Sequence, residues 1–312
     1  MIDLHMHSYY SDGIYSPADL VKKTKRAGLN FISLTDHNTI DGVKEFLAQA
    51  KAAGVRAVPG VEIYTLYPVK SPIKGAAKPQ FNRANQNRSL HLLGYGFDLA
   101  DKSLNLTLKE LQKQKIPRVK KAIKFLQADG WQLREEEVLS GPASYLGLVH
   151  LANALKKDSK NWQRIKKDFN WFPGKIITII DIIVKYFIKD KRVTSLYNGE
   201  SICPETTIPA DRAIKLIKQA GGQAVLAHPG EQLSWQDDEL IIELKKLGLS
   251  GLEAVSAHHS WSAMEHWQKV AKENGLIITC GSDFHGDLPE EWGFPIRSQW
   301  EYFIPHPEKM HF

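Results

Sequence analysis

Short apolar runs alternate with amphipathic stretches at both ends of the chain. The runs have the length of single strands, and the stretches between them repeat apolar positions at helical spacing. The predicted strands are 2–5, 31–35, 55–58 with 61–64, 90–95, 223–227, 251–255 and 276–280, and the predicted helices are 17–28, 41–53, 210–220, 237–247 and 262–274. Pro59 and Gly60 are expected to break the third strand. This alternation is typical of parallel β/α units.

The middle of the chain follows another pattern. From about residue 97 to 209 it is mostly helical, with Lys-rich periodic stretches at 107–128 and 144–157 and no clear strand. The pattern predicts an α/β fold in which seven strands form one barrel-like domain. We expect this domain to comprise residues 1–97 and 208–312, with a mostly helical insertion domain at 98–207.

Composition adds a charge preference. The chain has 312 residues, 43% hydrophobic and 24% charged, and its net charge of +6 favours an anionic partner such as a phosphorylated metabolite or nucleic acid. Cys203 and Cys280 are too few for a disulfide framework. We expect no signal peptide, and the apolar stretch 176–188 is too short to span a bilayer. A cytoplasmic protein without a membrane partner is therefore predicted.

Most predicted strands end in, or contain, a residue that can bind a metal ion. His5 and His7 are two residues apart, so their imidazoles point to the same side of a strand. In parallel β/α barrels the carboxyl ends of the strands meet on one face, where these side chains would gather. The candidates are His5, His7, Asp12, His37, Glu62, His91, His228, Asp283 and His285.

The number and type of these residues predict the cofactor. A single histidine is more often a hydrogen-bonded core residue, and we interpret His150, His258, His266, His306 and His311 in that way. Core packing does not explain nine candidates on one predicted face. Histidine with carboxylate and no thiolate suits Mn, Zn or Fe, and nine candidates exceed the needs of one ion. Two or three divalent metal ions are expected.

The motifs around these residues resemble those of the PHP (polymerase and histidinol phosphatase) family of metal-dependent phosphoesterases. They are DLHMHS at 3–8, SDG at 11–13, TDHNT at 35–39, GVEI at 60–63, LAHPG at 226–230 and GSDFH at 281–285. The resemblance implies a distorted (β/α)7 barrel. Within the family, the insertion, the run 213–230 and the segment 253–260 resemble the bacterial branch that hydrolyses 3′,5′-nucleoside bisphosphates and trims short RNA from its 5′ end.

The resemblance also implies roles for single residues. One ion would be held by His5, His7, Glu62 and Asp283, a second by Glu62, His91 and His228, and a third by Asp12, His37 and His285. A hydroxide between two ions would attack phosphorus, and His228, His259 or a metal-bound water would protonate the leaving oxygen. In the insertion, which would roof the site, Arg118 and His150 match substrate-directed positions, and His259 would face the phosphate. The partner would be a phosphorylated small molecule or short RNA, without an obligatory protein partner.

Two departures from the family pattern bear on the substrate. Similar enzymes carry Arg two residues before the position of His150, where this chain has Leu148, and Leu cannot bind phosphate as Arg does. The stretch 64–89 is also long and predicts an irregular basic loop. Its cations are Lys70, Lys74, Lys78, Arg83 and Arg88.

Three alternatives remain at this level. One is a monoester phosphatase acting on a small metabolite such as histidinol phosphate, against which the insertion and the LAHPG context argue. Another is a non-catalytic PHP accessory module, although such modules usually lose ligands and this set is complete. The third is metal-dependent C–N hydrolysis on a similar barrel, which typically lacks the Ser-Asp-Gly segment.

Overall fold

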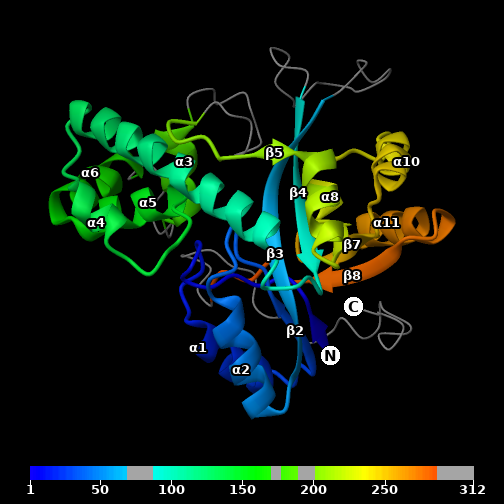
Figure 1. Cartoon of the computed structure of the whole chain (residues 1–312). Helices are drawn as coiled ribbons and strands as arrows, with labels where there is room; N and C mark the ends of the chain where they lie inside the picture. Colours follow the sequence, from blue (N-terminus) through cyan, green and yellow to red (C-terminus); the bar gives the residue numbers. More distant parts are fainter. Residues whose placement is uncertain (69–86, 170–176, 189–200, 287–312) are drawn as a thin grey trace.

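Within the residues that the structure describes, the barrel is built from eight strands. The computed structural model describes residues 1–68, 87–169, 177–188 and 201–286, and Figure 1 shows a curved sheet with helices on its outside and a helical lobe beside it. The strands are β1 (Ile2–Asp3), β2 (Phe31–Leu34), β3 (Arg56–Pro68), β4 (Asn87–Tyr95), β5 (Ile208–Pro209), β6 (Gln223–Leu226), β7 (Gly251–Ser256) and β8 (Ile277–Gly281).

Seven of these strands follow one another around the sheet in the order β1, β2, β3, β4, β6, β7, β8, and β5 pairs with β3 at one side. The first and last strands meet. The backbone N–H of Leu4 donates to the carbonyl of Cys280 at 3.0 Å, and Met6 forms a parallel bridge with Phe284. The predicted distorted β/α barrel is therefore confirmed, whereas β5 was not predicted.

The prediction that the strands run parallel is wrong for β4. This strand pairs antiparallel with β3 along its whole length and antiparallel with β6 on its other side. His91 consequently lies in the middle of a strand, opposite Tyr64 of β3, instead of at a carboxyl end. The His91 side chain still reaches the same rim, because β4 runs antiparallel beside β3 and this pairing places His91 next to Glu62.

The predicted break in the third strand is also wrong, since β3 runs through both Pro59 and Gly60. Gly60 is required by close packing, because a Cβ atom there would lie 2.2 Å from Ser33 Oγ and 2.6 Å from the Leu34 carbonyl oxygen.

Both ends of the predicted basic loop, residues 64–89, belong to strands β3 and β4. Arg88 lies in β4 and its Nη1 is 2.7 Å from Asp237 Oδ1, with both side chains buried. Lys70, Lys74, Lys78 and Arg83 lie outside the described residues.

Helices cover the outside of the sheet. Those of the barrel are α1 (Pro17–Arg26), α2 (Val43–Ala53), α8 (Ala210–Gln219), α9 (Pro229–Gln232), α10 (Asp238–Leu247) and α11 (Trp261–Glu273). Ser16 caps α1, its side chain accepting from the Asp19 N–H, and α2 ends at Gly54 with φ +71°. Apolar side chains from these helices and the strands form the barrel core, in which Trp267 of α11 is fully buried.

The helical lobe comprises α3 (Lys102–Ala128), α4 (Glu135–Leu139), α5 (Leu148–Lys157), α6 (Ser159–Phe169), α7 (Ile179–Ile182) and the π-helical turn η1 (Ile183–Phe187). It has its own apolar core, to which α7 and η1 contribute Ile182 and Phe187. Helix α3 runs from the barrel into the lobe (Figure 1). It packs Leu104 into the barrel core and Val119 into the lobe core, so our proposed boundary at residue 98 falls just before a helix that both parts share. Across the described ranges, no helix has the length and apolar character that crossing a membrane requires.

Candidate metal centre

Nine side chains that can bind metal ions gather at one rim of the barrel. They come from the segment after β1, from the ends of β2, β6 and β8, and from within β3 and β4. Among the described residues they form three groups, in each of which the candidate ligand atoms lie within 4.8 Å of one another. The groups are His7, Asp12, His37 and His285; His5, His7, Glu62 and Asp283; and Glu62, His91 and His228. These are the nine residues that the sequence singled out.

Glu62 connects the groups through its two oxygen atoms. Oε1 lies 2.9 Å from His91 Nδ1 and 3.2 Å from His228 Nε2. Oε2 lies 3.2 Å from His5 Nε2, 3.4 Å from His7 Nε2 and 2.8 Å from His37 Nδ1. One carboxylate thus faces two different sets of imidazoles, which is the arrangement that a bridging metal ligand requires.

The donor atoms of this cluster fit metal ions better than they fit one another. Several are buried and make no hydrogen bond in spite of short distances: His5 Nε2, both nitrogens of His7, Asp12 Oδ1, His37 Nδ1, Glu62 Oε2 and Asp283 Oδ1. A buried polar atom without a hydrogen bond costs about 1–3 kcal/mol, so such atoms are rare unless a ligand satisfies them. Neutral imidazole with carboxylate is a donor set for Zn, Mn or Fe.

Charge interactions keep the carboxylates of the cluster ionised. Burial opposes the ionisation of Glu62, but His37 and His5 hold its pKa well below the usual value. Burial likewise opposes the ionisation of Asp283, whose pKa is lowered by His5 and His285. Burial and the neighbouring His285 and His37 lower the pKa of His7 to about 3. His7 is therefore neutral, which is the form that binds metal.

A buried carboxylate that belongs to none of the three groups fixes two of the histidines. Glu253 of β7 is fully buried, and its Oε1 lies 3.0 Å from His5 Nδ1. Its Oε2 accepts from the backbone N–H of His228 at 2.8 Å. A metal-binding histidine usually donates its second nitrogen to such an acceptor, which orients the ring. With His5 Nδ1 directed at Glu253, Nε2 points into the cluster.

The loop between His7 and Asp12 is held by a second buried carboxylate. Asp36 accepts from the hydroxyl groups of Ser8 at 2.6 Å and Ser11 at 2.7 Å, and from the Ser8 backbone N–H. Gly13 passes so close to this loop that a Cβ atom would lie 2.2 Å from the His7 carbonyl oxygen. In the Ser-Asp-Gly motif, Ser11 and Gly13 are therefore needed to hold this loop, in addition to the role of Asp12 as a candidate ligand.

The backbone is strained at two candidate ligands. His228 has φ +22° and Asp283 has φ +54°, values that residues with side chains rarely adopt. Such conformations cost of order 1–3 kcal/mol and occur mainly at functional sites. Each residue lies two positions after the end of a strand, β6 or β8, so the strain directs its side chain from the strand end into the cluster.

Gln232 of α9 links His228 to β4. Its Oε1 accepts from the backbone N–H of His91 at 3.0 Å, and its Nε2 lies 3.0 Å from His228 Nδ1. In this arrangement Nδ1 of His228 accepts, and its proton resides on Nε2. Binding an ion through Nε2 would require the proton to move to Nδ1, where Glu231 Oε2 lies 3.4 Å away.

Two tyrosines at the rim were not predicted. Tyr64 of β3 stacks on His37, with ring centroids 4.5 Å apart, and meets His91 edge to face at 4.7 Å. Tyr145 belongs to the segment before α5, and its ring centroid lies 5.9 Å from that of Tyr64. The helical lobe therefore reaches the rim. The alternation of apolar residues in β3 carried no signal of this role, because a tyrosine in a strand is usually a core residue.

The two lobe residues that were predicted to contact the substrate make hydrogen bonds within the lobe. Arg118 Nη1 donates to the carbonyl of Glu205 at 2.5 Å, and His150 Nδ1 accepts from the Gly147 N–H at 3.0 Å. Burial lowers the pKa of His150 while the charge of Asp12 acts against it. Leu148 is buried in the lobe core, so the residue that replaces the family's Arg serves packing.

His259 and His258 differ from their predicted roles in this structure. His259 Nε2 accepts from the Gly230 N–H at 2.9 Å and Nδ1 lies 3.0 Å from the Ala254 carbonyl oxygen, so backbone groups occupy both ring nitrogens. A direct contact with phosphate would require one of these bonds to break. His258, interpreted from sequence as a core residue, instead contacts the candidate ligand Asp283, with Nε2 2.8 Å from Oδ2.

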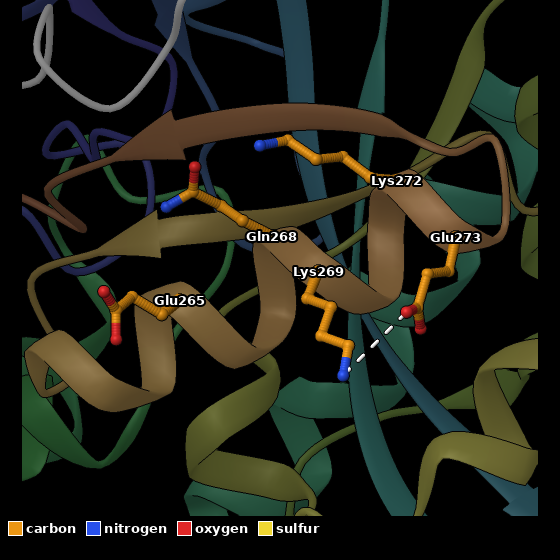
Figure 2. A pocket seen from close by; sticks show the side chains of 5 residues that line it. All are labelled: Glu265, Gln268, Lys269, Lys272 and Glu273. Carbon is orange, nitrogen blue, oxygen red and sulfur yellow. Dashed lines mark ion pairs between the residues drawn. The ribbon is translucent and has the colours of Figure 1, made fainter.

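A hollow elsewhere on the surface offers no comparable chemistry. Figure 2 shows it along the exposed side of α11, lined by Glu265, Gln268, Lys269, Lys272 and Glu273. Its charged groups include a solvent-exposed ion pair between Lys269 and Glu273, 3.9 Å apart. The opposite side of α11 packs on the barrel, so this hollow is separated from the nine-residue cluster. The candidate functional site is the cluster.

Comparison with known proteins gives consistent matches. The model of the PHP domain family matches residues 3–190. A 5′-3′ exoribonuclease of Haemophilus influenzae is 29% identical over 286 residues, which is 91% of this chain and 89% of that protein. A 3′,5′-nucleoside bisphosphate phosphatase of Chromobacterium violaceum is 25% identical over 295 residues, 94% of this chain and 89% of that protein. Among solved structures, a protein of Bifidobacterium adolescentis predicted to be a metal-dependent phosphoesterase has 22% identity and a TM-score of 0.70, covering 96% of this chain and 92% of that one.

Proposed function

Because the chain belongs to the PHP domain family, we propose that the nine-residue cluster is the active site of a metal-dependent phosphoesterase acting on a nucleotide. The substrate class we propose is a 3′,5′-nucleoside bisphosphate or the 5′ end of a short RNA. The names of two relatives that align with about nine-tenths of the chain support this choice. The protein is an enzyme of phosphoric ester hydrolysis, and its substrate is what we propose.

One observation carries the proposal. Buried imidazole and carboxylate groups from strands far apart in the sequence converge in three groups, and several of their atoms make no hydrogen bond. His7 links the first group to the second, and Glu62 links the second to the third. A fold that only needed stability would pair these atoms or replace them with apolar groups. The arrangement fits two or three divalent ions, with Mn, Zn or Fe as the candidates from ligand type.

Ions bound here would supply the Lewis acidity and the activated water that phosphoester hydrolysis requires at neutral pH. The chain itself holds the ligands rigid through Glu253 and Asp36. Of the two side chains predicted as proton donors, we prefer His228 to His259, a role that requires the proton to stay on His228 Nε2 in place of an ion. His228 lies within the cluster, whereas His259 uses both ring nitrogens on backbone groups.

The electrostatic field of the lobe suits an anionic substrate. Residues 98–207 contain 20 Lys and Arg against 13 Asp and Glu, whereas the remainder of the chain carries a net charge of −1. A basic region beside a metal site raises the local concentration of phosphate esters and speeds their association. We also propose a cytoplasmic location, where nucleotides are abundant, and no obligatory protein partner.

The test is phosphate release by Mn-loaded protein from adenosine 3′,5′-bisphosphate, alongside histidinol phosphate and a 5′-phosphorylated short RNA. Preferred release from the bisphosphate, or mononucleotide release from the RNA, is the expected result. Preference for histidinol phosphate would replace the proposed substrate with the small-metabolite alternative. No hydrolysis of any of the three by protein with metal bound would overturn the nucleotide proposal.

A further inference from the structure

His258 bridges two carboxylates at the edge of the metal centre. It lies between β7 and α11, where its Nδ1 is 2.7 Å from Glu231 Oε1 and its Nε2 is 2.8 Å from Asp283 Oδ2. The His258 side chain is 14% exposed, that of Asp283 12% and that of Glu231 37%, so the chain of three side chains reaches from the cluster to the surface. From sequence His258 was interpreted as a core residue, and Glu231 was given no role.

The geometry fixes the direction of the hydrogen bonds. Ionised carboxylate oxygens only accept, so His258 donates through both ring nitrogens. A charge-assisted hydrogen bond of this length is among the stronger side-chain interactions.

The consequence falls on Asp283. With Oδ2 bound to His258, only Oδ1 faces the cluster, where it lies 2.9 Å from His7 Nε2 and 3.3 Å from His5 Nε2. Asp283 follows β8 with the strained φ of +54°, so its backbone alone would not keep this orientation without a partner for the side chain. A carboxylate held by one oxygen presents a single donor atom to an ion.

We propose that Glu231 and His258 are positioning residues that hold Asp283 as a one-oxygen ligand of the metal centre. The inference rests on the metal-binding role of the cluster proposed above. Groups that orient metal ligands in this way typically contribute 10–100-fold to metal affinity. Glu253 does the same for His5, but it is fully buried and its replacement would also disturb the barrel core. The His258 chain at the rim is therefore the better one to test.

The test measures metal binding rather than turnover. Apo protein is titrated with Co²⁺, and the dissociation constants and the visible absorption spectrum of the bound ion are recorded for the unchanged chain, His258→Ala, His258→Gln and Glu231→Gln. We expect His258→Ala to weaken the affected site about 10–100-fold and to change the spectrum, because Asp283 is then free to turn. His258→Gln retains one donor toward Asp283 and should recover part of the affinity. Glu231→Gln should have the smallest effect.

The matched control is His266→Ala. His266 also pairs with an aspartate, its Nε2 lying 3.0 Å from Asp238 Oδ1, but it belongs to α11 outside the cluster. This control should bind Co²⁺ as the unchanged chain does. Thermal unfolding of the apo forms shows whether a variant is folded, and the Gln variant decides the question if His258→Ala is not.

Two outcomes are distinguishable. If the unchanged chain binds Co²⁺ and the folded His258 variants bind it with equal affinity and an identical spectrum, the positioning role is refuted while the proposed function stands. If the unchanged chain binds no Co²⁺, Mn²⁺ or Zn²⁺, the metal-binding premise fails and the inference fails with it.

Discussion

The barrel rim and the helical lobe bury polar side chains in opposite ways. In the lobe each of the buried polar groups named here is paired: Asn161 exchanges hydrogen bonds with the backbone of Gln132, and Lys115 forms an ion pair with Glu205 at 2.6 Å. At the rim, atoms of His7, Glu62 and Asp283 stay without hydrogen bonds although acceptors and donors lie nearby. The lobe satisfies its polar groups for stability, whereas the rim keeps them available for ligands.

The two regions also differ in what supports them. The rim residues are oriented by further buried carboxylates, Asp36 and Glu253, each of which accepts several hydrogen bonds. The lobe meets the barrel through apolar side chains of α3 and through polar contacts such as Gln112 Nε2 donating to the Asn38 carbonyl at 2.9 Å. The chemistry therefore depends on the barrel, and the lobe is expected to tune access and charge.

The largest effect should come from removing a rim ligand. His7→Ala or Asp283→Ala should abolish phosphate release, with a loss greater than the roughly 100-fold expected for residues that only orient ligands. His7 contributes to two of the three groups, so its loss affects more than one ion. The measurement is the turnover of Mn-loaded protein with the best substrate, together with circular dichroism to show that the fold is retained. Full activity in either variant would refute the metal assignment.

The next effect should arise at the joint between the regions. Lys115 is 1% exposed and pairs with Glu205, and its Nζ also donates to the Cys203 and Pro204 carbonyl groups. Lys115→Met leaves the charge of Glu205 buried, which typically costs about 3–5 kcal/mol. Urea denaturation measures the loss. The double variant Lys115→Met with Glu205→Gln is the control and should recover much of it, and no recovery would mean that packing matters more than charge.

The convergence of the rim residues was predictable from the sequence, and so was the helical character of the lobe, but the contacts of single lobe residues were not. Ligands such as His5 and His228 directly follow apolar strand residues, and a barrel brings strand ends together whatever lies between them. The role of Arg118 depends instead on where the segment 204–205 docks against α3, a long-range contact without local pattern. His258 escaped notice because a single histidine after a strand is more often structural.

The predictions of secondary structure also succeeded where local signals decide and failed where distant contacts decide. Glycine and cap residues marked the ends of α1 and α2, because these signals act within one turn of the chain. The antiparallel course of β4 and the continuity of β3 through Pro59 depend on neighbouring strands, which local patterns do not report. Neither error affected the site, since His91 and Glu62 project to the rim in either case.

Removing bound metal should change the stability of the rim and leave that of the lobe unchanged. Ions at 100 times their dissociation constant stabilise the folded state by about 2.7 kcal/mol per site, so dialysis against a chelator should lower the melting temperature and added Mn²⁺ should restore it. Amide hydrogen exchange should rise in the segments 5–12 and 281–285 that carry ligands. The lobe helices α5 and α6 are the internal control and should exchange as before. An equal rise in both regions would show that the lobe depends on the metal centre as well.

The smallest effect is expected at His150, where the comparison is most open to challenge. His150 Nδ1 accepts from the Gly147 N–H at the start of α5, and losing such a cap costs about 1 kcal/mol. We expect His150→Ala to lower stability by this amount and to change kcat/KM for the bisphosphate less than tenfold. His150→Asn supplies another acceptor for the Gly147 N–H and should restore the stability. If kcat/KM nevertheless falls about a hundredfold in this Asn variant, His150 contacts the substrate as the family resemblance implies. The lobe would then take part in the chemistry, and the separation between a reactive rim and a structural lobe would no longer hold.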